Sequence, residues 1–131
     1  MESSPLRKMI DMGIHVSGGS DAPVTPPDPV EGIFAACNHF RPDQSVTIAE
    51  ALRMFTYEVA RAGFDEKERG SLETGKIADM VILNKNPLKI NPNNLRELKI
   101  EKILLDGKPY KGGKGIGGMI AGAIKGRNRK I

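Results

Sequence analysis

The chain has 131 residues, enough for one domain of ordinary size, and 39% of them are hydrophobic while only 5% are aromatic. A single cysteine, Cys37, excludes an internal disulfide framework and fits a reducing compartment, so we expect a cytoplasmic protein. Residues 1–15 show no secretory signal. The sequence contains no run of about 20 apolar residues, so we predict no membrane-spanning helix.

The formal net charge of +4 comes from one end of the chain. Residues 111–131 carry six Lys and Arg and no acid, whereas residues 1–110 have a net charge of −2. Seven glycines in the basic segment predict a tail that does not fold alone. An anionic membrane surface, a neighbouring chain or nucleic acid could attract such a tail. The tail has no aromatic residue for base stacking, and we expect no nucleic-acid partner.

The first predicted unit is a helix followed by a strand. Apolar residues at i, i+3 and i+4 predict a helix from Pro5 to Met12, with Ser4 as its cap and Gly13 ending it in a left-handed conformation. Residues 14–17 are then predicted to form a strand, closed by two glycines. Helix, glycine, strand and glycine-rich loop in this order are typical of an α/β unit.

Two further helices are predicted beyond the proline-rich loop 22–29. The first runs from Val30 to Phe40, with Asp28 as its cap. The second runs from Thr47 to Ala62, and Thr47 followed by Glu50 three residues later predicts a capping box.

After Gly63 the sequence becomes extended and rich in turns. Residues 78–83 are predicted to form a buried strand, and residues 84–94 a polar loop. Residues 100–105 read as another strand, and the pair Asp106-Gly107 predicts a type I′ hairpin turn.

Four stretches, in this order and spacing, together resemble one family. They read GSDAPV from Gly19 to Val24, TIAEALRMFT from Thr47 to Thr56, GSLETGKIADMVIL from Gly70 to Leu83, and ILLDGK from Ile103 to Lys108. The combination is similar to the amidohydrolase superfamily, and within it to the YtcJ-like, or amidohydrolase 3, branch that includes N-substituted formamide deformylase. The resemblance covers roughly residues 5–110.

The resemblance implies only part of the family's fold. Family members carry an H-x-H pair, a bridging carboxylated lysine or acid, and two further histidines, whereas this chain has only His15 and His39. What it implies is an α/β fragment: the last βα portion of a metal-dependent hydrolase (β/α)8 barrel in residues 1–64, and the C-terminal part of the small β-sandwich, or composite, domain in residues 65–110. The Gly-rich basic tail of residues 111–131 follows.

Asp21 is the candidate catalytic residue. Its surroundings are ordinary turn residues, but (β/α)8 barrels place their active sites where strands end. In the family the matching aspartate contacts the metal and accepts a proton from the metal-bound water, so the resemblance implies both roles for Asp21. Gly19 and Ser20 beside it are expected in the substrate pocket. The cofactor implied for the parent enzyme is a divalent metal, zinc or a similar ion, which this chain alone is not expected to bind tightly.

Other polar residues have simpler interpretations. His15 is expected to pack within the barrel wall, and Cys37 to be a small buried residue on a helix. His39, two positions after Cys37, would point elsewhere on that helix. Asp79 is expected to fix a turn or to pair with Lys76.

Two functions follow as hypotheses. The first is a C-terminal fragment of a metal-dependent hydrolase that acts on non-peptide C–N bonds of small molecules, such as amides, formamides or cyclic amides, and is inactive alone. The alternative is a non-catalytic, stand-alone assembly or interaction module derived from an amidohydrolase. A single barrel strand leaves both of its faces uncovered, so we expect the isolated chain to self-associate or to be partly disordered in residues 1–30.

Overall fold

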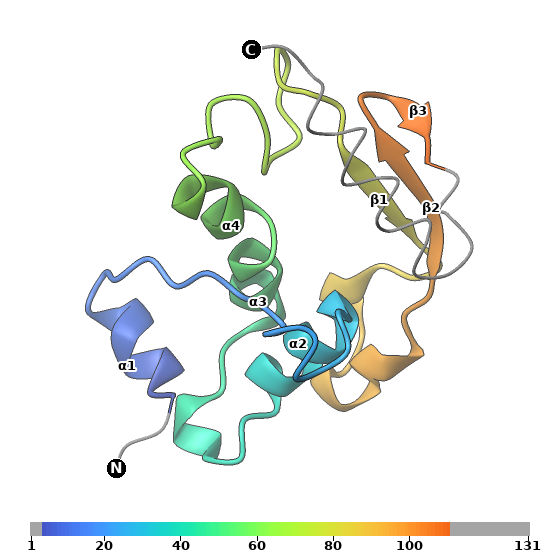
Figure 1. Ribbon diagram of the computed structural model, residues 1–131. Helices are drawn as coiled ribbons and strands as arrows, with labels where there is room; N and C mark the ends of the chain where they lie inside the picture. The colour runs from blue at the N-terminus through green and yellow to red at the C-terminus, as the bar shows by residue number, and fades with distance from the viewer. Residues whose placement is uncertain (1–3, 111–131) are drawn as a thin grey trace.

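The computed structural model describes residues 4–110, and the predicted basic tail lies outside them. A helical part comes first and a three-stranded sheet comes last (Figure 1). This order confirms a small α/β unit. The helices are α1 (Leu6–Asp11), α2 (Pro29–Cys37), α3 (Ile48–Met54) and α4 (Tyr57–Ala62), with 3-10 turns η1 (Pro42–Gln44), η2 (Pro87–Lys89) and η3 (Pro92–Glu97); the strands are β1 (Met80–Leu83), β2 (Ile100–Leu105) and β3 (Lys108–Pro109).

Helix α1 confirms the first predicted helix but differs in its cap. Pro5, not Ser4, is the N-cap residue, and its ring leaves the helix start without a side-chain hydrogen bond. Gly13 follows with φ of 76°, as predicted. The predicted strand at residues 14–17 is wrong. A strand forms by pairing, and no strand within residues 4–110 lies beside this segment to pair with it.

Helix α2 begins at its predicted cap and ends earlier than predicted. The Asp28 carboxylate accepts hydrogen bonds from the backbone N–H groups of Val30 and Glu31. At the other end, the Asn38 side chain donates to the carbonyl of Phe34 and also to that of Pro92. This side chain satisfies a carbonyl at the helix end, so the helix stops at Cys37 and not at Phe40.

The helix predicted from Thr47 to Ala62 is two helices. Its N-terminus is as predicted, with a reciprocal capping box between Thr47 and Glu50. The break falls at Phe55 and Thr56, where the Thr56 hydroxyl donates to the carbonyl of Leu52 at 2.8 Å and the backbone turns away with ψ of −87°. Threonine hydroxyls that bond back to a preceding carbonyl are known to bend helices, and here the helix is interrupted.

The sheet has the order β1-β2-β3 with antiparallel neighbours. The hairpin predicted at Asp106-Gly107 is confirmed, and both residues have the positive φ that a type I′ turn requires. Asp79 supports this turn by accepting the backbone N–H of Asp106 at 2.9 Å. Its ion-pair partner is Arg69 at 3.2 Å and not the predicted Lys76, which donates instead to a carbonyl and a hydroxyl before β1.

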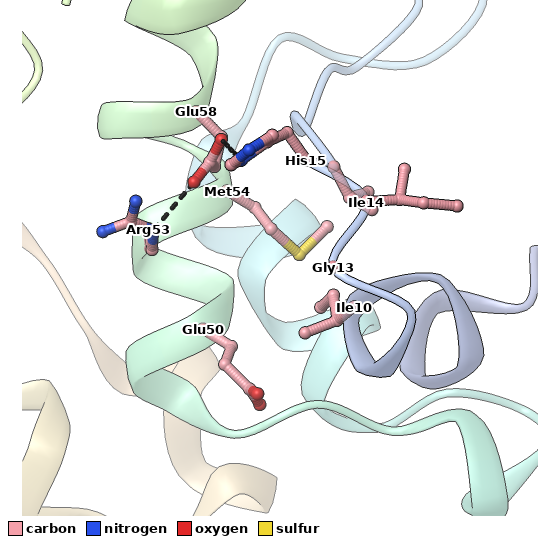
Figure 2. A pocket seen from close by; sticks show the side chains of 9 residues that line it. Ile10, Gly13, Ile14, His15, Glu50, Arg53, Met54 and Glu58 are labelled. Carbon is pink, nitrogen blue, oxygen red and sulfur yellow. Dashed lines mark hydrogen bonds and ion pairs between the residues drawn. The ribbon is translucent and has the colours of Figure 1, made fainter.

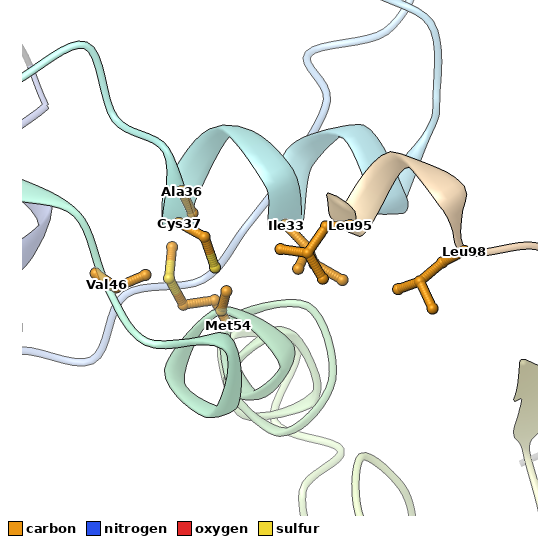
Figure 3. Close-up of a cluster of buried hydrophobic side chains, with 8 residues drawn as sticks. Ile33, Ala36, Cys37, Val46, Met54, Leu95 and Leu98 are labelled. Atoms are coloured by element: carbon orange, nitrogen blue, oxygen red, sulfur yellow. The ribbon is translucent and has the colours of Figure 1, made fainter. Parts of the chain in front are cut away.

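The core lies where α2, α3 and η3 meet, and Figure 3 shows their apolar side chains pointing toward one another. Leu95 of η3 is fully buried, so this turn ties the chain that precedes the sheet to the helical part. The ring of Phe34 also stacks under the guanidinium of Arg96, at 3.8 Å. The buried cluster consists of Ile33, Ala36, Cys37, Val46, Ala51, Met54, Leu95 and Leu98. Among the helices of residues 4–110, none has the length and apolarity needed to cross a bilayer.

Candidate functional site

The loop of residues 18–23 is held against the end of α3. The backbone N–H of Gly18 donates to the carbonyl of Met54 at 2.9 Å. The ring of Phe55 fills the space that a Cβ atom would need at Gly18, and also the space that one would need at Gly32 in α2. Two glycines therefore allow one aromatic ring to fix the point at which the loop leaves the helical part.

Asp21 lies on this loop with φ of 54°, a left-handed conformation that residues other than glycine seldom adopt. The backbone N–H of Val24 donates to the Asp21 carbonyl at 2.9 Å, and the Thr25 hydroxyl donates to the carbonyl of Ser20. Asp21 is exposed, and within residues 4–110 its carboxylate forms no hydrogen bond or ion pair. A carboxylate with no internal partner is available to a ligand.

This carboxylate suits a divalent cation in its chemistry, because hard cations prefer oxygen ligands. However, residues 4–110 contain no group of three His, Cys, Asp or Glu side chains placed to hold a metal ion. A catalytic zinc ion takes three protein ligands and keeps one open position. The described part of the chain therefore offers Asp21 as one ligand of a larger set. The roles of Asp21, Gly19 and Ser20 remain predictions.

A buried carboxylate, Glu58, joins α4 to the segment that leads into the loop (Figure 2). One of its oxygens lies 3.0 Å from Nδ1 of His15, and the other accepts a hydrogen bond from Nε of Arg53 at 2.7 Å. The prediction that His15 packs within a barrel wall is wrong for this structure. Its side chain is half exposed and turns toward Glu58, because residues 4–110 provide no adjacent strand to enclose it.

Sequence reasoning missed Glu58 because its partner His15 is 43 residues away. No local spacing pointed to Glu58 either, since the helix break at Phe55 and Thr56 separates it from the apolar face of α3. Around Glu58 and His15 lies a cavity of about 200 Å³, which Figure 2 shows between α1 and the α3–α4 pair. Ile10 and Ile14 contribute apolar surface to the cavity, so it is a cleft with one charged wall.

Cys37 agrees with its structural interpretation, whereas His39 lies beyond the end of α2 and not on the helix as expected. Cys37 is buried in α2, and burial raises the pKa of its thiol to about 11, which keeps it protonated at neutral pH. The His39 ring stacks on Phe40 with centroids 4.4 Å apart, and its Nδ1 accepts the backbone N–H of Arg41. No nucleophilic pair forms between these two residues.

A bidentate ion pair joins α1 to α3. Both terminal nitrogens of Arg7 donate to the Glu50 carboxylate, each at 2.8 Å. The same carboxylate accepts the backbone N–H of Thr47 in the capping box. The hydrogen bonds from Arg7, followed by those from Thr47, lower the pKa of Glu50 from 4.5 to about 2, although partial burial opposes the shift.

The ion pair between Arg7 and Glu50 makes the stability of the fold depend on pH. Because the folded-state pKa of Glu50 is the lower one, its stabilisation is present above about pH 4.5 and is lost as the pH falls toward 2. We expect Glu50→Gln to reduce the free energy of unfolding by about 1–3 kcal/mol at pH 6. The variant should also lose less of its free energy of unfolding than the unaltered chain does as the pH falls below 4.5. Urea unfolding between pH 6 and pH 2.5 measures this. Glu101→Gln, at an exposed position on a strand, is the control. If the free energy of unfolding of Glu50→Gln fell with pH as steeply as that of the unaltered chain, the prediction would be contradicted.

The sequence is similar to that of known proteins. The sequence profile described as "Amidohydrolase family" matches residues 1–110. N-substituted formamide deformylase of Arthrobacter pascens is 36% identical over an alignment of 110 residues that covers 79% of this chain and 20% of that protein. Putative amidohydrolase YtcJ of Bacillus subtilis is 32% identical over an alignment of 112 residues that covers 78% of this chain and 21% of that protein. The chain thus spans about a fifth of the length of the curated relatives it matches.

A solved structure shows the same relation in three dimensions. The chain superposes on an uncharacterized metal-dependent hydrolase from Pyrococcus furiosus with a TM-score of 0.60 and 32% sequence identity. The match covers 66% of this chain and 18% of that one. The similarity therefore includes both sequence and fold, over a limited part of the larger protein.

Proposed function

This chain belongs to the amidohydrolase family over residues 1–110, and from that premise we propose that it is part of a metal-dependent hydrolase of non-peptide C–N bonds. The observation that carries the proposal is the Asp21 carboxylate, exposed on a fixed loop and without a partner in residues 4–110. The relatives support a small-molecule substrate, since one is named as a deformylase of N-substituted formamides.

The proposed division of the fold follows the change from helices to sheet. Residues 1–64, with α1 to α4, would be the last part of a (β/α)8 barrel together with its closing helices. Residues 65–110, with the three strands, would be the C-terminal part of a small β-sandwich domain. In support, the loop of Asp21 follows residues 14–17, whose composition is that of a strand and which have no strand beside them in residues 4–110.

The proposed mechanism gives Asp21 two tasks. Its carboxylate would help to hold the divalent metal, and it would act as general base and then as general acid. When bound, a divalent ion such as zinc supplies Lewis acidity that makes water nucleophilic near neutral pH. The Asp21 carboxylate takes a proton from the attacking water and delivers it to the leaving nitrogen. Gly19, without a side chain, leaves room for the substrate beside the loop.

The chain alone is proposed to be inactive. Residues 4–110 supply one candidate metal ligand, and a catalytic site needs more than one. The alternative function, a non-catalytic module derived from an amidohydrolase, shares this expectation for the isolated chain. The two hypotheses separate only when the rest of an amidohydrolase is present, which determines the form of the test.

The test is a chimera. The segment of the Arthrobacter deformylase that matches this chain is replaced by residues 1–110 of this chain, and hydrolysis of an N-substituted formamide is measured. We expect turnover that a chelator abolishes and a divalent metal restores. The isolated chain, assayed in parallel, should show none. A chimera that folds and binds metal, yet does not hydrolyse the formamide or other simple amides, would contradict the proposed function.

A further inference from the structure

Two contacts hold the segment that leads to Asp21 against the α3–α4 pair. The first joins His15 to Glu58, with Nδ1 of the ring 3.0 Å from a carboxylate oxygen (Figure 2). The second lies three residues later, where the backbone N–H of Gly18 donates to the carbonyl of Met54 at 2.9 Å. The segment and the helix pair run in opposite chain directions between these contacts. Together the contacts fix where the segment lies along the helices.

The contact with His15 completes the pairing of a buried carboxylate. Glu58 is only 7% exposed, whereas the His15 side chain is half exposed. One Glu58 oxygen accepts a hydrogen bond from Nε of Arg53 at 2.7 Å, and the other faces His15. An ionised carboxylate only accepts hydrogen bonds, so Nδ1 of His15 carries a proton, in a neutral or a charged ring. Because a buried oxygen without a donor is unfavourable, a donor side chain is favoured opposite Glu58.

The contact of Gly18 alone is compatible with two registers. A Cβ atom at Gly18 would overlap the ring of Phe55, so this place in the structure requires a glycine. A shift of the chain by one residue would bring Gly19 to the same place, but it would also bring Val16, which has no donor, opposite the buried carboxylate. A shift the other way would bring the Cβ atom of Ser17 against the ring. Only the observed register satisfies both contacts.

We propose that His15 and Glu58 are positioning residues of the catalytic loop, because they select the register that sets the place of Asp21. A shift by one residue moves the chain by up to about 3.5 Å. Misplacement of a catalytic group by about 1 Å can cost about 100-fold in rate. The inference rests on the proposed function, in which Asp21 is the catalytic residue, and it adds the two side chains that place it. Both act on the reaction only through Asp21.

The experiment compares His15→Leu with His15→Asn in the deformylase chimera. The two replacements are similar in size, but the asparagine N–H donor lies as many bonds from Cα as Nδ1 of histidine does, and leucine has no donor. We expect His15→Leu to lower kcat by about 10–100-fold with little change in KM, and His15→Asn to retain most of the activity. Because Glu58 keeps its hydrogen bond from Arg53, His15→Leu should remain folded.

A second measurement, hydrogen exchange of the full chain, does not depend on activity. His15→Leu should accelerate exchange at the amide of Gly18 by about tenfold or more, since the register that pairs this amide with Met54 is no longer selected. His15→Asn should keep the amide protected. Glu97→Gln removes an exposed ion pair with Lys85 and is the control, which should change neither exchange at this amide nor kcat.

Each outcome decides the inference. Equal kcat in His15→Leu and the control, equal losses in both His15 variants, or unchanged exchange at Gly18 overturns it. Lower stability of His15→Leu with unchanged kcat assigns the pair a structural role only and also overturns it. Should His15→Leu fail to fold, Glu58→Gln replaces it with the same expected loss, because its amide N–H group opposes one of the two donors. An inactive unaltered chimera contradicts the proposed function alone, and the exchange measurement then decides whether His15 fixes the register.

Discussion

Asp21→Asn in the deformylase chimera is expected to lower kcat by about 10²–10⁴-fold, the range over which a positioned general acid or base contributes. Asparagine keeps the size of the side chain and one oxygen but cannot take up a proton. It also binds a divalent metal without a compensating negative charge. Because the native carboxylate makes no internal contact in residues 4–110, the change should leave the unfolding midpoint of the chimera unaltered.

The control for this prediction is Asp28→Asn, the same substitution seven residues later in the chain. Asp28 caps α2 by accepting two backbone N–H groups, and asparagine caps helices as well as aspartate does. Asp28→Asn should therefore preserve both kcat and stability. Steady-state kinetics and bound-metal content of both variants complete the measurement. Retention of more than about a tenth of the activity by Asp21→Asn would remove Asp21 from the catalytic residues.

Leu95→Ala is expected to have the largest effect on stability, about 2–5 kcal/mol in the free energy of unfolding. Leu95 is the largest fully buried side chain in residues 4–110, and it projects from η3 into the cluster built on α2 and α3. Truncation removes the contacts of the Leu95 side chain with this cluster, and it leaves a cavity between η3 and the helices α2 and α3. Since small domains have only 5–15 kcal/mol of stability in total, we expect a large shift of the urea midpoint.

Leu88→Ala provides the comparison for this prediction. Leu88 is 61% exposed on η2, seven residues earlier, and its truncation should change the free energy of unfolding by no more than about 0.5 kcal/mol. Urea unfolding of the full chain, followed by circular dichroism, compares the two variants. Similar small effects in both would mean that η3 docks loosely on α2, against the burial seen here.

Features set by neighbouring residues were predicted well from the sequence. The Asp28 cap, the capping box of Thr47 and Glu50, and the hairpin at Asp106-Gly107 all occur where expected, because each depends on side chains and backbone groups within a few positions. The family was also predicted correctly, since four short stretches kept their order and spacing over the matched segment.

Features set by distant residues were not predicted. The segment 14–17 has a strand-like composition, but a strand needs a neighbour, and residues 4–110 provide none. The break near Thr56 depends on a hydroxyl that bonds back to the preceding turn, which the apolar stripe does not reveal. The pairing of His15 with Glu58 joins residues 43 positions apart, and neither has a local pattern that identifies the other.

The ring of Phe55 has a consequence for anyone who transplants the loop into another scaffold. It abuts Gly18 on the loop and Gly32 on α2 at the same time, so the three residues behave as a single module. Enlarging either glycine should be tolerated only with a smaller residue at position 55, and the energies of such paired changes will not add. A loop grafted without Phe55 and Gly32 would keep its sequence, but it would lose the contact that fixes its direction.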